Sequence, residues 1–158
     1  MINLPNTARG LMNISKSKVL VIGGSSGLGL GIAKECVLNK AKVIIASRSE
    51  EKLQKATLEI GTSTQYQVVD ISLKQSILYL FQKTGAIDHL VITSGFVTGK
   101  PFDDLSESDA REDFEINFWG KFNVSKIAAE HIKSGGSITY ISGAFAKKPN
   151  PDVFITSS

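Results

Sequence analysis

Short apolar runs rich in valine and isoleucine alternate along this chain with segments whose apolar residues recur at helical spacing. Strands that are hydrophobic at nearly every position are typical of a parallel sheet covered by helices on both faces. The pattern predicts strands at residues 18–22, 42–46, 66–69, 88–93 and 137–142. It predicts helices at residues 27–39, 50–60 and 72–83, and a long helix at 108–133 with a candidate break near Asn117 and a stop at Gly135-Gly136.

This order of elements predicts the fold class. Alternating strands and helices with right-handed crossovers give an α/β, doubly wound parallel sheet of the Rossmann type, and we expect the strand order 3-2-1-4-5. Residues 17–158 are expected to form this domain, after a polar N-terminal arm at residues 1–16. Residues 143–158 are expected to be loop, because Pro149 and Pro151 bar regular structure.

The helix residues expected to face the core are Leu28, Ile32, Ala33, Cys36, Leu53, Ala56, Ile60, Leu73, Ile77, Leu80 and Phe81.

Composition narrows the class of protein. With 158 residues, 42% hydrophobic and 21% charged, the chain can build one sizeable core. No apolar run approaches the ~20 residues of a membrane span, and no signal-peptide pattern is present, so a cytoplasmic protein away from membranes is expected. The single cysteine, Cys36, excludes an internal disulfide and a Cys-based zinc cluster, and no metal site is predicted. The net charge of +3 comes from bases scattered among 15 acids, which does not favour a nucleic-acid partner.

A glycine-rich turn, Gly23-Gly24-Ser25-Ser26-Gly27-Leu28-Gly29, joins the first predicted strand to the first helix. Gly23 permits a sharp turn, Gly27 lets backbone approach a pyrophosphate, and Gly29 lets the helix pack close to the sheet. Free N–H groups and the helix dipole attract phosphates there, and the hydroxyls of Ser25 and Ser26 can add donors. The turn is interpreted as a phosphate-binding site; a tight turn without a ligand is the alternative.

The spacing Gly23-x-x-x-Gly27-x-Gly29 resembles that of the short-chain dehydrogenase/reductase family, and so do Thr93-Ser94-Gly95 and Asn117. The resemblance runs from Lys18 to the end of the chain. It implies an NAD(P)-dependent oxidoreductase that acts on a carbonyl or alcohol. The residues expected at the dinucleotide are Gly23, Ser25, Ser26, Gly27, Leu28, Gly29, Ser47, Arg48, Asp70, Ile71, Ser94 and Gly95.

Arg48 bears on which dinucleotide is bound. In NAD-dependent proteins an acid after the second strand bonds the ribose 2′-hydroxyl, and Ala46-Ser47-Arg48-Ser49 has no acid at that place. A guanidinium can pair with a 2′-phosphate through two parallel hydrogen bonds. The sequence therefore favours NADP(H) over NAD(H), the alternative being that Arg48 is a solvated residue before a helix.

Two further polar residues have both a structural and a ligand-binding interpretation. The resemblance implies that Asp70 holds the adenine ring, but Asp70 can also cap the helix predicted to begin near Ser72. Asn117 matches an asparagine that holds a water in the family's proton relay, and it can also be a buried residue that ties helix to strand.

The catalytic residues that the resemblance implies are a serine, a tyrosine and a lysine, and the chain departs from this pattern. Gly143 stands at the serine place, with Ser142 one residue earlier, and the tyrosine place falls near Thr156. A threonine hydroxyl has a pKa far above that of a phenol and cannot replace it without strong activation. Only Asn117 and Ser142 are predicted as catalytic residues. The last helix and strands of the family are expected to be missing from this chain, which is interpreted as either a fragment or a naturally short protein.

Three functions therefore remain open at the level of sequence. The first is an NADP(H)-dependent oxidoreductase with its dinucleotide site intact and its catalytic set missing or degenerate. The second is a non-catalytic dinucleotide-binding sensor or scaffold, and the third is another Rossmann-type binder such as a methyltransferase. The long predicted helix at 108–133 resembles the family's dimer-forming helix, which makes a homo-oligomer a candidate assembly.

Overall fold

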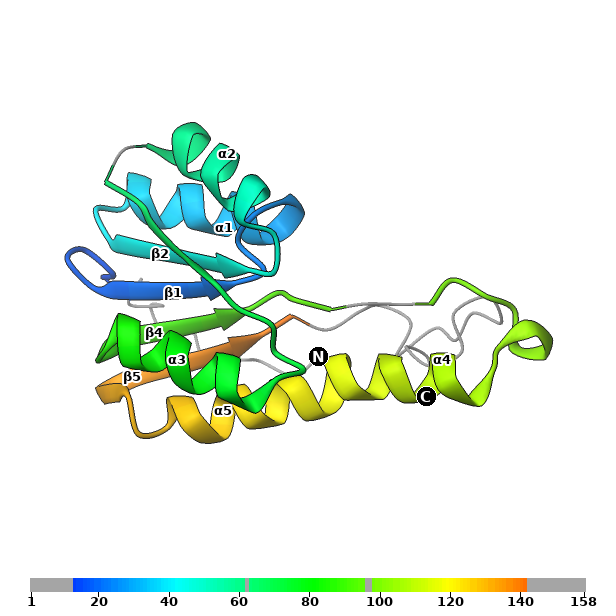
Figure 1. The fold of residues 1–158 in the computed structure, drawn as a ribbon. Helices are drawn as coiled ribbons and strands as arrows, with labels where there is room; N and C mark the ends of the chain where they lie inside the picture. Colours follow the sequence, from blue (N-terminus) through cyan, green and yellow to red (C-terminus); the bar gives the residue numbers. More distant parts are fainter. Residues whose placement is uncertain (1–12, 62, 96–97, 142–158) are drawn as a thin grey trace, which may run out of the picture.

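The computed structural model describes residues 13–61, 63–95 and 98–141, which form one parallel sheet flanked by helices (Figure 1). The sheet has five strands in the order β3-β2-β1-β4-β5, as predicted. The strands are β1 (Lys18–Ile22), β2 (Lys42–Ser47), β3 (Gln65–Val68), β4 (Ile87–Ile92) and β5 (Ile132–Tyr140). Every neighbouring pair is parallel, so the carboxyl ends of all five strands lie at the same edge of the sheet.

Helices cover both faces of the sheet. Helices α1 (Gly27–Leu38) and α2 (Glu50–Ile60) lie on one face, and α3 (Lys74–Thr84) and α5 (Lys121–Ala128) lie on the other (Figure 1). Alternate residues of β1 serve two separate cores: Val19 and Val21 pack toward α1 and α2, while Leu20 and Ile22 pack toward α3 and α5. This two-sided burial explains why β1 is apolar at successive positions.

The long predicted helix is a rod of three segments that extends past the carboxyl edge of the sheet (Figure 1). After a short 3-10 turn, η1 (Phe102–Asp104), come α4 (Glu107–Phe114), the π-helical turn η2 (Glu115–Gly120) and α5. The rod begins at a cap on Ser106 and not at Ser108. Near Asn117 the helix widens by one π-helical turn and does not break.

The predicted end of that rod at Lys133 is wrong. Helix α5 ends at Ala128, and β5 already begins at Ile132, so Gly135-Gly136 lies inside the strand and stops no helix. The pairing of β4 with β5 shifts register between Ile87 and His89, and Gly135 has a φ of +80°. A Cβ on Gly136 would overlap the Asp88 carbonyl oxygen, so the glycine pair permits an irregular, close strand contact.

Most of the helix residues expected in the core are buried, Ile32 and Ile60 are partly buried against it, and two are exposed. Leu73 is 58% exposed because α3 begins at Lys74, two residues later than the predicted start at Ser72, which leaves Leu73 at the N-cap. Leu28 is 59% exposed because it stands in the first turn of α1, at the carboxyl edge of the sheet. Neither residue therefore contributes to packing as the helical spacing predicted.

The rod carries an exposed aromatic face. The exposed side chains are Phe114, Phe118, Trp119 and Phe122. The Trp119 ring meets Phe118 and Phe122 edge-on, at centroid distances of 5.0 and 5.9 Å. Self-association through this helix stays a prediction. Of the predicted arm at residues 1–16, residues 1–12 lie outside the described residues, while Ile14 packs against the core beside α1 and β2. The predicted loop at residues 143–158 also lies outside the described residues.

Candidate functional site

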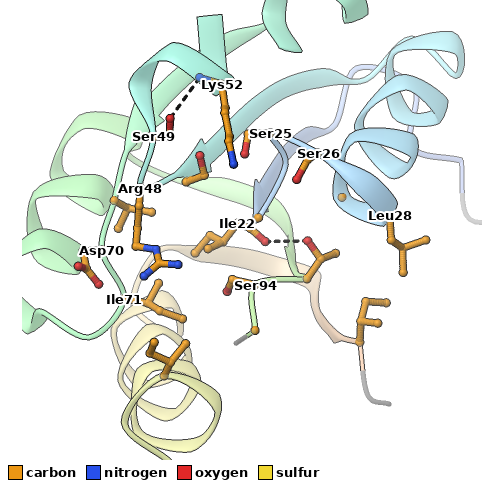
Figure 2. Close-up of a pocket in the computed structure, with 18 residues that line it drawn as sticks. Ile22, Ser25, Ser26, Leu28, Arg48, Ser49, Lys52, Asp70, Ile71 and Ser94 are labelled. Carbon is orange, nitrogen blue, oxygen red and sulfur yellow. Dashed lines mark hydrogen bonds between the residues drawn. The ribbon is translucent and has the colours of Figure 1, made fainter. Parts of the chain in front are cut away.

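A cleft of about 480 Å³ opens at the carboxyl edge of the sheet, between the ends of β1, β2, β3, β4 and β5 (Figure 2). Crevices outside the carboxyl ends of parallel strands, where the strand order reverses, are the usual ligand sites of doubly wound sheets. The cleft is lined by Ile22, Gly23, Ser25, Ser26, Leu28, Gly29, Ser47, Arg48, Ser49, Lys52, Val69, Asp70, Ile71, Thr93, Ser94, Gly95, Ile116 and Ile141.

The glycine-rich turn forms one wall, and Gly23 and Gly29 are packed there without room for a side chain. Gly23 has a φ of +90°, and a Cβ there would lie 2.6 Å from the Ser94 amide nitrogen. A Cβ on Gly29 would lie 2.8 Å from the Gly23 carbonyl carbon and closer still to the Gly23 carbonyl oxygen. These contacts hold the start of α1 against β1 and the end of β4.

The amino end of α1 faces this cleft without a protein cap. Ser26 stands at the N-cap position, but its side chain makes no capping hydrogen bond. The first amides of α1 therefore keep their hydrogen-bonding capacity for a ligand. Gly27 does not line the cleft, but its φ of +52° and the open space around its Cβ position leave backbone accessible there.

Arg48 and Lys52 form a basic wall where β2 passes into α2. Figure 2 shows both side chains directed into the cleft, Arg48 from the end of β2 and Lys52 from α2. Ser49 lies between them and caps α2, since its Oγ accepts a hydrogen bond from the Lys52 amide at 3.3 Å. The sequence predicted Arg48 at this wall and missed Lys52, because a lysine in a polar helix pattern is typical of a solvated surface.

Asp70 makes local hydrogen bonds before α3 and also lines the cleft, while its role at an adenine ring stays a prediction. Its Oδ1 accepts hydrogen bonds from the Ser72 amide at 3.0 Å and from the Ser72 hydroxyl at 2.7 Å. This local capping precedes α3, and the same residue also lines the cleft beside Ile71. Gly120 of the rod packs under Ile71, where a Cβ would lie 3.0 Å from the Ile71 Cγ1.

Two buried hydroxyls in the cleft walls lack a hydrogen-bond partner among the described residues. They are the Oγ atoms of Ser47, at the end of β2, and of Ser94, after β4. The neighbouring Thr93 hydroxyl is satisfied, since it donates to the Ile22 carbonyl at 3.1 Å. Because buried polar atoms are normally paired, the two serines indicate places where a bound molecule supplies the partner.

Asn117 lies beside the cleft and does not line it. Its Oδ1 is 3.0 Å from the place of a Cβ on Gly95, so a side chain at residue 95 would press on the Asn117 carboxamide. One turn later, the Lys121 Nζ lies 4.0 Å from the same place, and burial lowers the pKa of this ammonium. The π-helical turn and the first residue of α5 thus place a carboxamide and an amine behind the loop that follows β4.

No tyrosine reaches the cleft. The sequence has three, and all lie in the described part of the chain, at residues 66, 79 and 140. None lines the cleft, and the Tyr140 hydroxyl instead contacts the Ser125 Oγ on α5. Ser142, the other predicted catalytic residue, lies outside the described residues, although its neighbour Ile141 lines the cleft.

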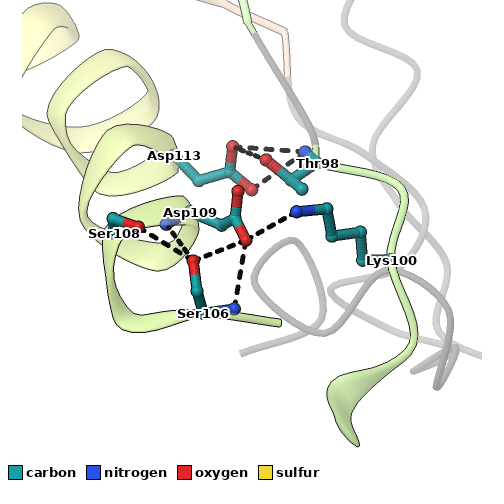
Figure 3. Close-up of polar contacts among 6 residues, drawn as sticks. All are labelled: Thr98, Lys100, Ser106, Ser108, Asp109 and Asp113. Atoms are coloured by element: carbon teal, nitrogen blue, oxygen red, sulfur yellow. Dashed lines mark hydrogen bonds and ion pairs between the residues drawn. The ribbon is translucent and has the colours of Figure 1, made fainter. Parts of the chain in front are cut away.

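Polar contacts tie the segment after β4 to both ends of α4 (Figure 3). The fully buried Asp113 accepts hydrogen bonds from the Thr98 amide, at 3.1 and 3.2 Å, and from the Thr98 hydroxyl at 3.1 Å. Lys100 forms an ion pair with Asp109 at 2.8 Å, and Ser106 shares a reciprocal capping box with the same carboxylate. The Lys100 and Ser106 contacts lower the pKa of Asp109 to about 2.

Comparisons with known proteins agree on one family. Over residues 17–156 the chain matches the family described as short chain dehydrogenase. It is 33% identical over 120 residues to a 3-dehydrosphinganine reductase of Arabidopsis thaliana, covering 73% of this chain and 36% of that protein. It is 27% identical over 149 residues to 11-beta-hydroxysteroid dehydrogenase A of Sesamum indicum, covering 88% of this chain and 43% of that protein.

Solved structures give the same result for the fold. A short chain dehydrogenase from Bacillus anthracis superposes with a TM-score of 0.83 and 27% identity, covering 92% of this chain and 62% of that structure. The chain therefore spans less than two thirds of the length of each relative named here. A helix able to cross a membrane is not found within the described ranges.

Proposed function

Because this chain belongs to the short chain dehydrogenase family, we propose that its cleft binds NADP(H) in preference to NAD(H), for oxidoreduction of a carbonyl or alcohol. Dinucleotide binding follows from the family, and the preference for the 2′-phosphate is the specific part of the proposal. The observation that carries it is Arg48, which lines the cleft at the end of β2, where NAD-dependent proteins place an acid.

The residues of the cleft fit such a dinucleotide. The uncapped start of α1 and the glycine turn offer amides to a diphosphate, without a Cβ at the positions of closest approach. The unpartnered Oγ atoms of Ser47 and Ser94 offer hydrogen bonds on the two sides of β1. When bound, the nicotinamide supplies or accepts a hydride.

The charges in the cleft support the choice of cofactor. Among the described residues that line the cleft, Asp70 is the one acid, and its Oδ1 is engaged by Ser72. Arg48 and Lys52 are the cations, and neither belongs to an ion pair among the described residues. A phosphate dianion gains from two cations, whereas a ribose diol does not.

For the chemical step we assign Asn117 and Ser142 as the residues to test. The Asn117 carboxamide stands next to Gly95, at the end of β4, where it can position a water or the loop backbone. A phenolic proton donor is not provided by Tyr66, Tyr79 or Tyr140, since none of them lines the cleft. The proton must therefore come from a group other than a tyrosine of this sequence.

That observation favours a second candidate function, a dinucleotide-binding module without turnover. The two functions are separated by following the absorbance of reduced nicotinamide with a panel of ketones and alcohols. Hydride transfer that is lost in Asn117→Ala or Ser142→Ala supports the oxidoreductase. Tight cofactor binding with no transfer to any substrate supports the module.

The cofactor preference is tested with Arg48→Ala and calorimetric titration of NADP(H) and NAD(H). We expect a loss of about 1–3 kcal/mol for NADP(H) and little change for NAD(H), because only NADP(H) offers a 2′-phosphate to the guanidinium. Arg111→Ala is the matched control, since Arg111 pairs with Glu107 on α4 and does not line the cleft. Equal losses for both cofactors would refute the assignment of Arg48.

A further inference from the structure

We infer that Lys52 is a second specificity residue, which together with Arg48 forms a two-cation pocket for the phosphomonoester of the dinucleotide. The inference rests on the proposed function and adds to it a residue on a different element. Arg48 follows the end of β2, whereas Lys52 lies in the first turn of α2, so the two cations reach the cleft from either side of the Ser49 cap.

The backbone of α2 fixes where Lys52 points. Ser49 is the N-cap, and its Oγ accepts a hydrogen bond from the amide of Lys52, which places Lys52 at the third helical position. Side chains of a helix lean toward its amino end, so the Lys52 stem is directed back toward Ser49 and Arg48. Figure 2 shows the resulting orientation, with the amine directed into the cleft.

A lysine in the first turn of a helix is not favoured by the helix dipole. The first turn of a helix favours anions, and α2 supplies Glu50 and Glu51 there. Both acids are engaged elsewhere, Glu51 by Lys55 at 2.6 Å and Glu50 by the Tyr66 hydroxyl at 3.2 Å. Lys52 is therefore left without an anionic partner among the described residues, and it faces a cleft.

The cleft wall beside the two cations also offers neutral hydroxyl groups that can donate hydrogen bonds to a phosphate. The buried Ser47 Oγ has no partner, and Ser25 of the glycine turn also lines the cleft. Two cations and nearby hydroxyls are the donor set that a phosphate dianion prefers, because its oxygens accept several charge-assisted hydrogen bonds at once.

The test compares two ligands that differ only in the phosphate at issue. Calorimetry measures binding of adenosine 2′,5′-bisphosphate and of adenosine 5′-monophosphate to the chain and to Lys52→Met. We expect the affinity for the bisphosphate to fall about tenfold or more, and the affinity for the monophosphate to stay unchanged. Lys52→Arg should keep most of the affinity, since it keeps the charge.

Lys55→Met is the matched control, because Lys55 lies on the same helix but is paired with Glu51 and does not line the cleft. The inference is overturned if Lys52→Met leaves both affinities unchanged or lowers both equally. It is also overturned if Lys55→Met has the same effect as Lys52→Met. If the unsubstituted chain binds both ligands equally, the proposed preference for NADP(H) is refuted. If it binds neither of these ligands nor NADP(H), the proposed dinucleotide binding is refuted.

Discussion

Alanine at residue 29 tests how the glycine turn is built. A Cβ at this position would lie 2.8 Å from the Gly23 carbonyl carbon and would overlap the Gly23 carbonyl oxygen and the Thr93 Oγ1. Two of these atoms are backbone, so the overlap cannot be relieved by rotating a flexible side chain. The start of α1 has to move away from the ends of β1 and β4.

The magnitude follows from two opposing effects. Overpacking of a tight contact costs about 1–3 kcal/mol, and the upper end applies because backbone must shift. Alanine recovers about 1 kcal/mol through its higher helix propensity. We therefore expect Gly29→Ala to lower the free energy of unfolding by about 2 kcal/mol and to weaken NADP(H) binding, because the amides of α1 are displaced.

Gly31→Ala provides the matched control on the same helix. No atom lies within 4 Å of a Cβ at Gly31, so only the propensity effect remains. This variant should be more stable than the unsubstituted chain by about 0.5–1 kcal/mol, with NADP(H) affinity unchanged. Urea titrations give the stabilities, and calorimetry gives the affinities. A Gly29→Ala variant as stable and as competent in binding as Gly31→Ala would refute the close-packing argument.

Two further predictions concern the polar contacts between the segment after β4 and α4. Asp113→Ala should lower the free energy of unfolding by about 1–3 kcal/mol, because the Thr98 amide and hydroxyl lose their acceptor. Urea titration measures the change in stability, and unchanged hydrogen exchange at the Thr98 amide would contradict the assigned contact. The Asp109 carboxylate should titrate at a pH of about 2 in NMR, below its ordinary 3.8, and Lys100→Met should raise that midpoint. Because the pKa of Asp109 is lower in the folded state, its ionised carboxylate stabilises the fold above about pH 4, and this stabilisation is lost as the pH falls toward 2. A midpoint that Lys100→Met leaves unchanged would contradict Lys100 as the cause.

The sequence was sufficient wherever a single physical requirement determined the residue pattern. The run Val19–Ile22 is apolar because both faces of β1 are buried, and the bounds of β1, Lys18–Ile22, were predicted correctly. The glycine turn could also be predicted from the sequence, because the positive φ at Gly23 and the close contacts at Gly29 allow no other residue type at these two positions.

Prediction failed where one residue type serves two physical purposes. The pair Gly135-Gly136 was interpreted as a helix stop, but a glycine pair also permits an irregular close contact between strands, which is what β4 and β5 form. Lys52 was missed for the same reason, because a lysine is typical of solvated helix surfaces. Only the Ser49 cap and the geometry of α2 show that this lysine faces the cleft.

One wall of the cleft is rigid backbone and the other consists of exposed side chains, and only the second loses much conformational entropy when a ligand binds. The glycine turn is already immobilised by its contacts with β1 and β4, so ordering it around a ligand costs little. Arg48 and Lys52 are exposed side chains, and each has about 2 kcal/mol of rotamer entropy to lose. Affinity for the cofactor is therefore most readily increased by substitutions that restrict these two side chains before the ligand arrives.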